Sequence, residues 1–289
     1  MPSTIQDMRR ERLFGSADLR IGTGLEIGPL HRPLVTREMA DLRYVDVSSE
    51  EDLRAHYASD PNVVTTEIPS MDFVLRDSDR IKTVGEAAAP DAPYSWIVAS
   101  HVIEHVPDIV GWLADLATLT NDDAKVYLVI PDRRFTFDAH RPPTTVGQML
   151  EANFRRDRTP SVRAVYDYFR SVITIDAPDA WAGRVPGREA RIHDLDGAMA
   201  QVGLARNEGQ YIDCHVWLFT PESFVEQIVE LGEIGLCDFV VDSVIHTFRD
   251  ELEFYAVLRR LPRGLEPESK RAALQAGLQT FPDQIIPSQ

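Results

Sequence analysis

Three ionisable side chains within five positions are the part of this sequence best suited to chemistry. His101, Glu104 and His105 have the spacing H-x-x-E-H, and side chains at i, i+3 and i+4 share one face of a helical turn. Imidazole nitrogens and a carboxylate gathered in this way can hold one divalent cation or move protons at a substrate. The same string occurs in a class of metalloproteases, but Pro107 follows at once and argues against the long helix those enzymes need.

A second group of polar residues lies further along the chain. In an extended segment, alternation puts Asp213 and His215 on the same face. An Asp–His pair is costly to bury without partners, so His215 could enter a cleft as a base or as a metal ligand, or it could anchor the segment structurally. Asp138, His140 and Arg141 follow a predicted strand and could also reach a substrate.

Five short apolar runs predict strands that alternate with segments of helix length. This alternation predicts parallel strands joined by crossover helices. The helix after the fourth strand begins near Asp108, and Ile109, Trp112, Leu113 and Leu116 form one apolar stripe on it. In such a sheet, ligands bind at the carboxyl ends of the strands. The predicted strands are residues 25–27, 43–47, 71–75, 96–98 and 126–130.

Polar or turn-forming residues come at the ends of the first two strands. Residues 25–27 run into a turn at Gly28-Pro29, where glycine allows a sharp turn and a close approach to a ligand. Asp46 ends the second strand, 20 residues after Glu26, where a carboxylate can hold ribose hydroxyls. The short glycine motif differs from G-x-G-x-x-G and argues against a nicotinamide enzyme.

In their order and spacing, these motifs resemble those of class I S-adenosylmethionine-dependent methyltransferases over about residues 20–135. The resemblance implies an α/β, Rossmann-like fold with a mostly parallel seven-stranded sheet and a helical insertion or lid after the fifth strand. It implies S-adenosyl-L-methionine as the cofactor. The matching pieces are Glu26-Ile-Gly28, Asp46, Asp77, the stretch 99–108 and the strand 126–131.

The resemblance also implies a role for each matching residue. The loop after Gly28 is Gly-Pro-Leu-His-Arg-Pro, which is stiffer than the usual Gly-x-Gly-x-Gly and leaves a non-catalytic cofactor-binding or partner protein as an alternative. Glu26, Gly28 and Pro29 are expected to contact the methionine and ribose part of the cofactor, and Asp46 its ribose hydroxyls. Asp77 and Ser78 are expected to contact the adenine, and Ser100 and His101 to form the wall beside the methyl group.

The H-x-x-E-H string is similar to the E-x-x-E-H string of small-RNA 2′-O-methyltransferases and ubiquinone-pathway O-methyltransferases, where it resembles a divalent-metal site. Here His101 replaces the first Glu. The resemblance implies Mg²⁺ or another divalent metal at Glu104 and His105. The alternative is a metal-free site in which Glu104 accepts hydrogen bonds and His105 packs. We predict His101, His215 and Asp138 as the catalytic residues.

The chain is predicted to be a single methyltransferase domain over residues 1–289. Its core covers about residues 20–135 and 216–260, an insertion or substrate lid covers about 136–215, and residues 262–289 form a loosely attached tail. The insertion is rich in arginine: residues 133–191 hold 11 arginines and 7 acidic residues, a local charge of +4. These arginines can bind an anionic substrate or form a solvated surface.

Composition excludes several classes of protein. The net charge of −16 argues against binding long nucleic acid. There is no apolar run long enough for a membrane span and no apolar segment near Met1 that would indicate a secretory signal. Cys214 and Cys237 form no disulfide framework and are expected to be buried thiols of a cytoplasmic protein. The oligomeric state is open, with a homodimer as one alternative.

The expected function is S-adenosylmethionine-dependent O-methylation of a polar or anionic small molecule, such as a sugar or a glycan end. The pieces 133–138 and 213–217 resemble methyltransferases of bacterial polysaccharide clusters. Two alternatives are a metal-independent C- or N-methyltransferase of secondary metabolism and the non-catalytic protein of the same fold.

Overall fold

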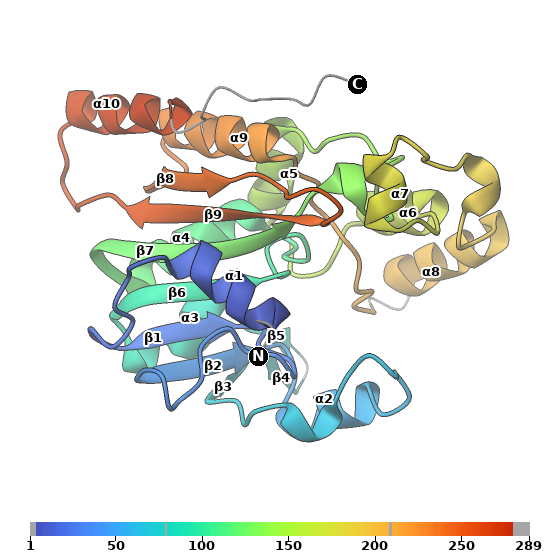
Figure 1. Ribbon diagram of the computed structural model, residues 1–289, viewed down its shortest axis with the longest axis horizontal. Coiled ribbons are helices and arrows are strands. Elements are labelled where there is room, and N and C mark those ends of the chain that lie inside the picture. Colours follow the sequence, from blue (N-terminus) through green and yellow to red (C-terminus); the bar gives the residue numbers. More distant parts are fainter. Residues whose placement is uncertain (1–3, 79, 208–209, 280–289) are drawn as a thin grey trace.

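A seven-stranded sheet forms the centre of the computed structural model, which describes residues 4–78, 80–207 and 210–279. The strand order is β3-β2-β1-β6-β7-β9-β8, and β9 alone runs antiparallel to its neighbours β7 and β8 (Figure 1). The predicted fold class is confirmed. The strands of the sheet are β1 (Gly24–Ile27), β2 (Leu42–Asp46), β3 (Phe73–Val74), β6 (Tyr94–Ser100), β7 (Thr120–Pro131), β8 (Phe239–Ile245) and β9 (Glu253–Arg260), and β4 (Arg76–Asp77) pairs with β5 (Arg80–Ile81) outside it.

Helices cover both faces of the sheet because both faces are apolar. On β6, Ile97 and Ala99 pack into one hydrophobic cluster, whereas Trp96 and Val98 pack into another on the opposite face. The first cluster takes in α3, α4 and α9, and the second takes in Leu13 of α1. The bounds of these helices are α1 (Ile5–Phe14), α3 (Val84–Ala88), α4 (Ile109–Leu119) and α9 (Pro221–Glu233), and α2 (Glu50–His56) follows β2.

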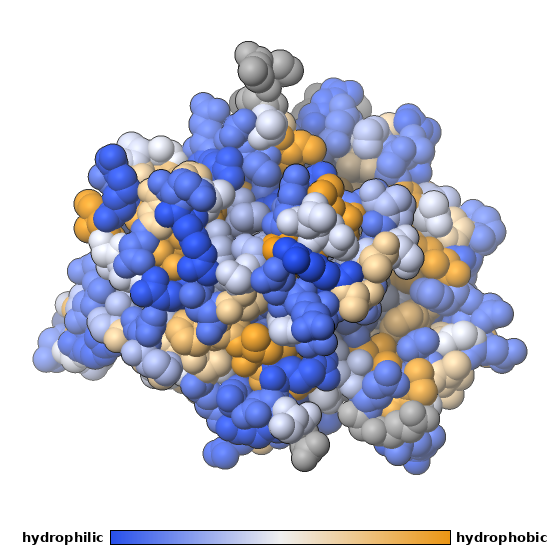
Figure 2. All heavy atoms as spheres, turned by 90° about the horizontal axis from the view of Figure 1, so that it is seen from below, coloured by the Kyte–Doolittle hydropathy of each residue, from blue (hydrophilic) through white to orange (hydrophobic). Residues whose placement is uncertain are grey.

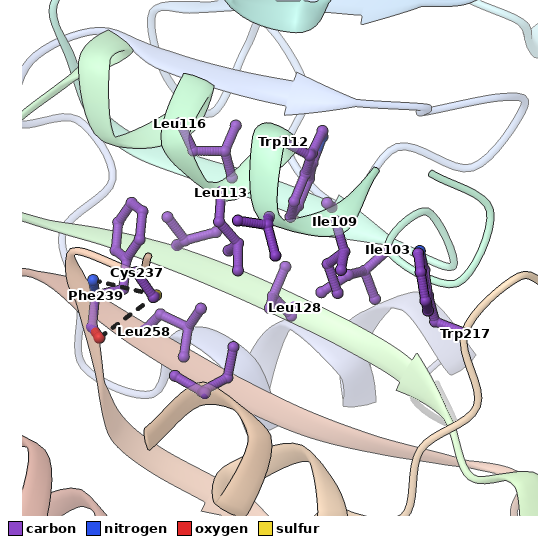
Figure 3. Packing of buried hydrophobic residues seen from close by; sticks show 14 of the residues in the cluster. Ile103, Ile109, Trp112, Leu113, Leu116, Leu128, Trp217, Cys237, Phe239 and Leu258 are labelled. Carbon is purple, nitrogen blue, oxygen red and sulfur yellow. Dashed lines mark hydrogen bonds between the residues drawn. The ribbon is translucent and has the colours of Figure 1, made fainter. Parts of the chain in front are cut away.

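Figure 3 shows the larger cluster where α4 packs on the sheet. Leu113 and Leu116 of α4 face Leu128 of β7, as their helical spacing predicted. Trp217 lies at one end of this cluster beside Ile103, which belongs to the loop that carries the H-x-x-E-H string. The packing of the core therefore continues directly into the loop of interest.

The predicted insertion forms four helices that lie beyond the carboxyl ends of the parallel strands (Figure 1). Three of the four match the predicted helical segments. The fourth lies partly in a predicted loop, where Asp176 caps the helix and Pro178 occupies its first turn. The helices are α5 (Val146–Arg155), α6 (Val162–Ser171), α7 (Ala177–Trp181) and α8 (Leu195–Asn207).

The expectation of a loosely attached tail is wrong for residues 267–278. They form helix α10 (Pro267–Leu278), which packs on α9 and β8. Leu274 is 2% exposed and lies so close to Gly232 of α9 that a Cβ there would come within 2.3 Å of it. The four prolines suggested an irregular segment, but α10 begins with one of them and buries an apolar face. Residues 280–289 of the predicted tail lie outside the described residues.

The face of the molecule in Figure 2 is mainly hydrophilic, with hydrophobic side chains gathered in small separate areas. Among the described helices, none has the length and apolar character that a bilayer crossing requires. Cys214 and Cys237 are buried and unpaired, as expected.

The docking of α10 gives a test of the fold. Leu274→Ala removes a fully buried side chain, so the free energy of unfolding should fall by about 2–4 kcal/mol in a denaturant titration. Leu278→Ala, on the same helix but 36% exposed, should change it by less than about 0.5 kcal/mol. Equal effects of the two substitutions would mean that α10 does not dock as described.

Candidate functional site

A cavity of about 380 Å³ lies at the carboxyl ends of β1 and β2. Its floor contains Gly28 and Asp46, two of the residues predicted to contact a cofactor. One wall comes from the hairpin and the start of α3, and another from the loop between β6 and α4. Other residues that line the cavity include Ile81, Lys82, Thr83 and Val84 near the hairpin, Val102, His105 and Asp108 in the loop, and Asn153, Arg156, Arg158 and Tyr211 from the insertion.

Gly28 is required at its position for two reasons. Its φ of +67° is in the left-handed region, which favours glycine. A Cβ would also come within 2.8 Å of Val102 across the cavity wall. The glycine therefore lets the first strand turn tightly against the loop that follows β6. Pro29 is buried and does not line the cavity.

Glu26 is placed differently from the prediction. Its carboxylate is 2% exposed and accepts hydrogen bonds from the backbone N–H groups of Leu34 (2.6 Å) and Val35 (2.9 Å). Burial raises the pKa of Glu26 to about 7, against the opposing effect of these two bonds. The predicted contact with the cofactor does not fit this geometry, because both carboxylate oxygens hold the loop that follows Gly28. Glu26 therefore shapes the cavity from behind.

Asp46 lies where the sequence predicted it. Its side chain lines the cavity and accepts a hydrogen bond from the backbone N–H of Ser48 at 3.2 Å. Burial, helped by the nearby charge of Asp213, raises the pKa of Asp46 to about 6. A carboxylate in this position can accept hydrogen bonds from a pair of hydroxyl groups, and its protonation would weaken such binding.

Asp77 and Ser78 do not line the cavity, contrary to prediction. Both are exposed, and Asp77 forms an ion pair of 2.9 Å with Lys82. The third strand ends early, so the hairpin carries Asp77 past the sheet edge and brings Ile81 and Val84 into the wall instead. The apolar spacing of these two residues beside the Thr83 helix cap is the signal that could have identified them.

The H-x-x-E-H string forms a turn directly after β6 and not a regular helix. His101 has a φ of +53°, and its backbone N–H donates to Val129 at 2.9 Å, which continues the sheet into the turn. Ser100 is half-buried at the end of β6 and lies outside the cavity lining. The turn brings Glu104 into the interior, where it is 0% exposed, and it leaves His105 on the cavity wall.

Three histidines surround the carboxylate of Glu104. The ring nitrogens closest to its Oε1 are Nδ1 of His101 at 3.4 Å, Nε2 of His105 at 3.9 Å and Nε2 of His215 at 4.0 Å. None of these contacts is a hydrogen bond, and neither oxygen of Glu104 has a hydrogen-bond partner among the described residues. The sequence predicted the meeting of His101, Glu104 and His105, and it offered the entry of His215 as one alternative.

The second nitrogen of each histidine contacts a different carboxylate. Nε2 of His101 lies 2.8 Å from Glu253. Nδ1 of His105 lies 3.0 Å from Asp213, and Nδ1 of His215 lies 2.6 Å from Asp138. Glu253 belongs to β9, Asp213 to the segment before α9, and Asp138 to the loop after β7.

Burial disfavours the charged form of His101, but its contacts with Glu104 and Glu253 outweigh burial and raise its pKa to about 9. Burial likewise opposes the charged form of Glu253, yet His101 and Arg9 lower its pKa to about 2. These two groups therefore form an ion pair at neutral pH. Arg9 extends the pair to helix α1 through a 2.7 Å hydrogen bond to Glu253.

Asp138 orients His215 and does not reach a substrate. It is 1% exposed and forms a 2.6 Å ion pair with Arg141, whose guanidinium also donates to the backbone carbonyl of His215. His140 points elsewhere, with its ring 2.6 Å from the carbonyl oxygen of Pro186. The structure therefore does not fit the predicted catalytic role of Asp138, whose carboxylate instead positions the ring of His215.

The alternation predicted for the segment around His215 is wrong. Asp213 is exposed, but Cys214, His215 and Val216 are all buried in succession. The segment forms no regular strand and passes between the sheet and the insertion, with both sides packed. The backbone carbonyl of Glu104 accepts hydrogen bonds from Val216 (2.7 Å) and Trp217 (3.2 Å), which fixes the segment beside the H-x-x-E-H turn.

Sequence reasoning missed Glu253 and the two cavity arginines, Arg156 and Arg158. Glu253 begins β9, the antiparallel strand between β7 and β8, and only its pairing with the end of β7 brings it beside His101. Arg156 ends α5 with a φ of +54°, a cap position that no residue-type preference indicates. No local pattern in the sequence would have identified these residues.

The fold and the cavity are those of a Rossmann-like enzyme that binds a nucleoside cofactor at the strand ends. Residues 6–232 match a protein-family model described as a methyltransferase domain. The chain belongs to this methyltransferase family, and it is a class I S-adenosylmethionine-dependent methyltransferase. A comparison with proteins of curated function finds no match.

Solved methyltransferase structures also match the chain, at low identity. One is a Listeria monocytogenes protein proposed to be an S-adenosylmethionine-dependent methyltransferase (12% identity, TM-score 0.44, 88% of this chain and 97% of that one). Another is an S-adenosylmethionine-dependent methyltransferase from Mesorhizobium loti (10% identity, TM-score 0.43, 88% of this chain and 96% of that one). A third is the magnesium protoporphyrin IX methyltransferase of Synechocystis with bound S-adenosylhomocysteine (11% identity, TM-score 0.39, 88% of this chain and 81% of that one). These TM-scores are too low to indicate a substrate for this chain.

The buried Glu26 gives a test of the cavity loop. Glu26→Gln replaces one acceptor oxygen by an amide N–H₂ that faces a backbone N–H. We expect the free energy of unfolding to fall by about 1–3 kcal/mol and the affinity for S-adenosylhomocysteine to fall with it. Glu38→Gln, an exposed substitution nearby, is the control and should change neither quantity in denaturation and calorimetry. A Glu26→Gln protein with unchanged stability would contradict the described hydrogen bonds.

The raised pKa of Asp46 predicts a pH dependence of cofactor binding. If the carboxylate form accepts the ribose hydroxyls, affinity for S-adenosylhomocysteine falls as the pH falls through about 6. Calorimetry should give binding about tenfold weaker at pH 5 than at pH 8. Asp46→Asn should bind weakly and lose this pH dependence. A variant that keeps the same pH profile would assign the titration to another group.

Proposed function

We propose that this methyltransferase transfers the methyl group of S-adenosyl-L-methionine to a hydroxyl oxygen of a polar or anionic small molecule, such as a sugar or a glycan end. Methyl transfer from a sulfonium is an in-line displacement, which requires alignment of the acceptor and exclusion of water. A hydroxyl acceptor must also lose a proton. An amine or carbon acceptor needs less of this assistance, so a polar proton-handling cluster beside the cofactor favours oxygen.

The observation that carries the proposal is the position of His105. Its side chain lines the cavity and at the same time belongs to the cluster around Glu104. An acceptor held at this wall would lie between the cofactor cavity and the histidines. In the metal-free site, Nε2 of His215, whose ring is oriented by Asp138, could then take the hydroxyl proton, and His101 would stay charged through Glu253.

The anionic character of the proposed substrate is supported by the cavity arginines. Arg156 and Arg158 line the cavity at the end of α5, and neither guanidinium forms an ion pair or hydrogen bond with a described residue. Guanidinium groups without partners can bind carboxylate or phosphate by paired hydrogen bonds. An acceptor that carries such a group could therefore be held in the cavity that His105 also lines.

The residues at Glu104 and His105 also fit a divalent metal, because a buried carboxylate without hydrogen bonds lies among imidazole nitrogens. Such an ion, when bound, lowers the pKa of an acceptor hydroxyl. With such an ion bound, the residues of the cluster would still hold and orient the acceptor and exclude water from it, and a ring nitrogen that binds the ion would no longer act as the base.

The test is methyl transfer with a panel of acceptors. Calorimetry first measures binding of S-adenosylhomocysteine, and release of this product is then followed with sugars, sugar phosphates, amines and matched deoxy analogues. We expect turnover only with hydroxyl-bearing acceptors and higher turnover with anionic ones. Turnover confined to amines or carbon acceptors would favour the metal-independent alternative. Cofactor binding without any turnover would favour a non-catalytic protein.

His215→Ala separates catalysis from binding. Because His215 does not line the cofactor cavity, we expect kcat to fall by about 10²–10⁴-fold while the Kd for S-adenosylhomocysteine changes by less than about twofold. His193→Ala is the matched control, since His193 lies in a loop of the insertion and packs on Phe169. A His215→Ala protein with normal kcat would remove His215 from the mechanism.

A further inference from the structure

The carboxylate of Glu104 presents an unusual electrostatic situation. It is 0% exposed, and neither oxygen accepts a hydrogen bond from a described residue. An ionised carboxylate in the interior is strongly destabilising unless it is paired or coordinates a metal. Ordinary hydrogen bonds are absent, although three ring nitrogens are within 4.0 Å of Oε1. The charged ring of His101 compensates this carboxylate from one side, whereas Nε2 of His105 and Nε2 of His215 face it from 3.9 and 4.0 Å with room for a cation between them.

The donor atoms are spaced as the ligands of one ion. The ligand atoms of Glu104, His105 and His215 all lie within 4.8 Å of one another. Contacts of 3.9 and 4.0 Å are too long for hydrogen bonds. Nitrogen and oxygen ligands about 2.1 Å from a single ion lie about 3.0–3.4 Å apart, so a small closure of these side chains would complete the site.

The outer contacts fix the ligating nitrogen of each ring. Nδ1 of His105 faces Asp213 at 3.0 Å, and Nδ1 of His215 faces Asp138 at 2.6 Å. A carboxylate that accepts from one ring nitrogen leaves the lone pair on the other, and metal-binding histidines have this arrangement. In both rings Nε2 is the atom directed at Glu104. Arg141 holds Asp138 in turn, at 2.6 Å.

We propose that Glu104, His105 and His215 bind a divalent transition-metal ion, whose open coordination positions take hydroxyl groups of the acceptor. Two imidazoles and one carboxylate suit Zn²⁺, Fe²⁺, Co²⁺ or Ni²⁺, whereas Mg²⁺ prefers oxygen ligands. His101 is not a ligand in this assignment: its Nε2 is held by Glu253, and its Nδ1 lies against the carboxylate that it positions. Because His105 also lines the cavity, the open positions would face the acceptor. The role toward the acceptor rests on the proposed function, but metal binding does not.

The test is a titration of the chelator-treated protein with Co²⁺ alone, followed by visible absorption, without cofactor or acceptor. We expect one Co²⁺ per chain, displaced by Zn²⁺ and unaffected by a large excess of Mg²⁺. His215→Ala should weaken binding by roughly 100-fold or more, and Asp213→Asn by about 10-fold. Asp213 is exposed, so its substitution should leave folding intact. His193→Ala is again the matched control and should bind as the unmodified chain does.

Three results would overturn the inference. The first is a folded chain that binds no Co²⁺, and the second is a His215→Ala or Asp213→Asn variant that binds Co²⁺ as tightly as the unmodified chain. The third is displacement of Co²⁺ by Mg²⁺ at a comparable concentration. Calorimetry with S-adenosylhomocysteine on the same samples separates the two proposals. Cofactor binding and turnover without metal binding would overturn the metal centre and leave the proposed function standing. Metal binding without cofactor binding would overturn the proposed function and leave the metal centre standing.

Discussion

The buried negative charge of Glu104 is the constraint on which this site depends. A carboxylate that is fully removed from water and lacks hydrogen bonds requires compensation by nearby positive groups. His101, His105 and His215 surround it, and each is backed by a further carboxylate. Carboxylates and imidazole rings alternate outward from Glu104, so removing one member would leave its neighbours without a polar partner. This is why the polar cluster can exist beside a hydrophobic core.

The cluster also connects parts of the chain that are far apart in sequence. Arg9 of α1 holds Glu253 of β9, and Glu253 holds His101 at the end of β6. The segment that carries His215 is fixed to the backbone of Glu104 and to Asp138 after β7. The N-terminal helix, the antiparallel strand and the insertion therefore meet at one point. A site built in this way is rigid only when the whole sheet is formed.

The stiff loop after Gly28 is compatible with a cofactor cavity. Glu26 anchors this loop from behind, through the backbone of Leu34 and Val35, and Gly28 lets it pass close to Val102. The departure from the usual glycine-rich pattern thus changes how the loop is held and does not fill the cavity.

The sequence by itself determined the sheet, because apolar strands separated by helical stripes have few ways to bury their faces. It also determined Gly28, Asp46 and the turn that carries His105, because these residues follow strand ends whose position is set by local patterns. Only the tertiary structure decided that Glu26 faces away from the cavity and that Glu253 reaches His101. Such contacts depend on strand pairing and on the packing of the insertion, which bring together residues that no local spacing relates.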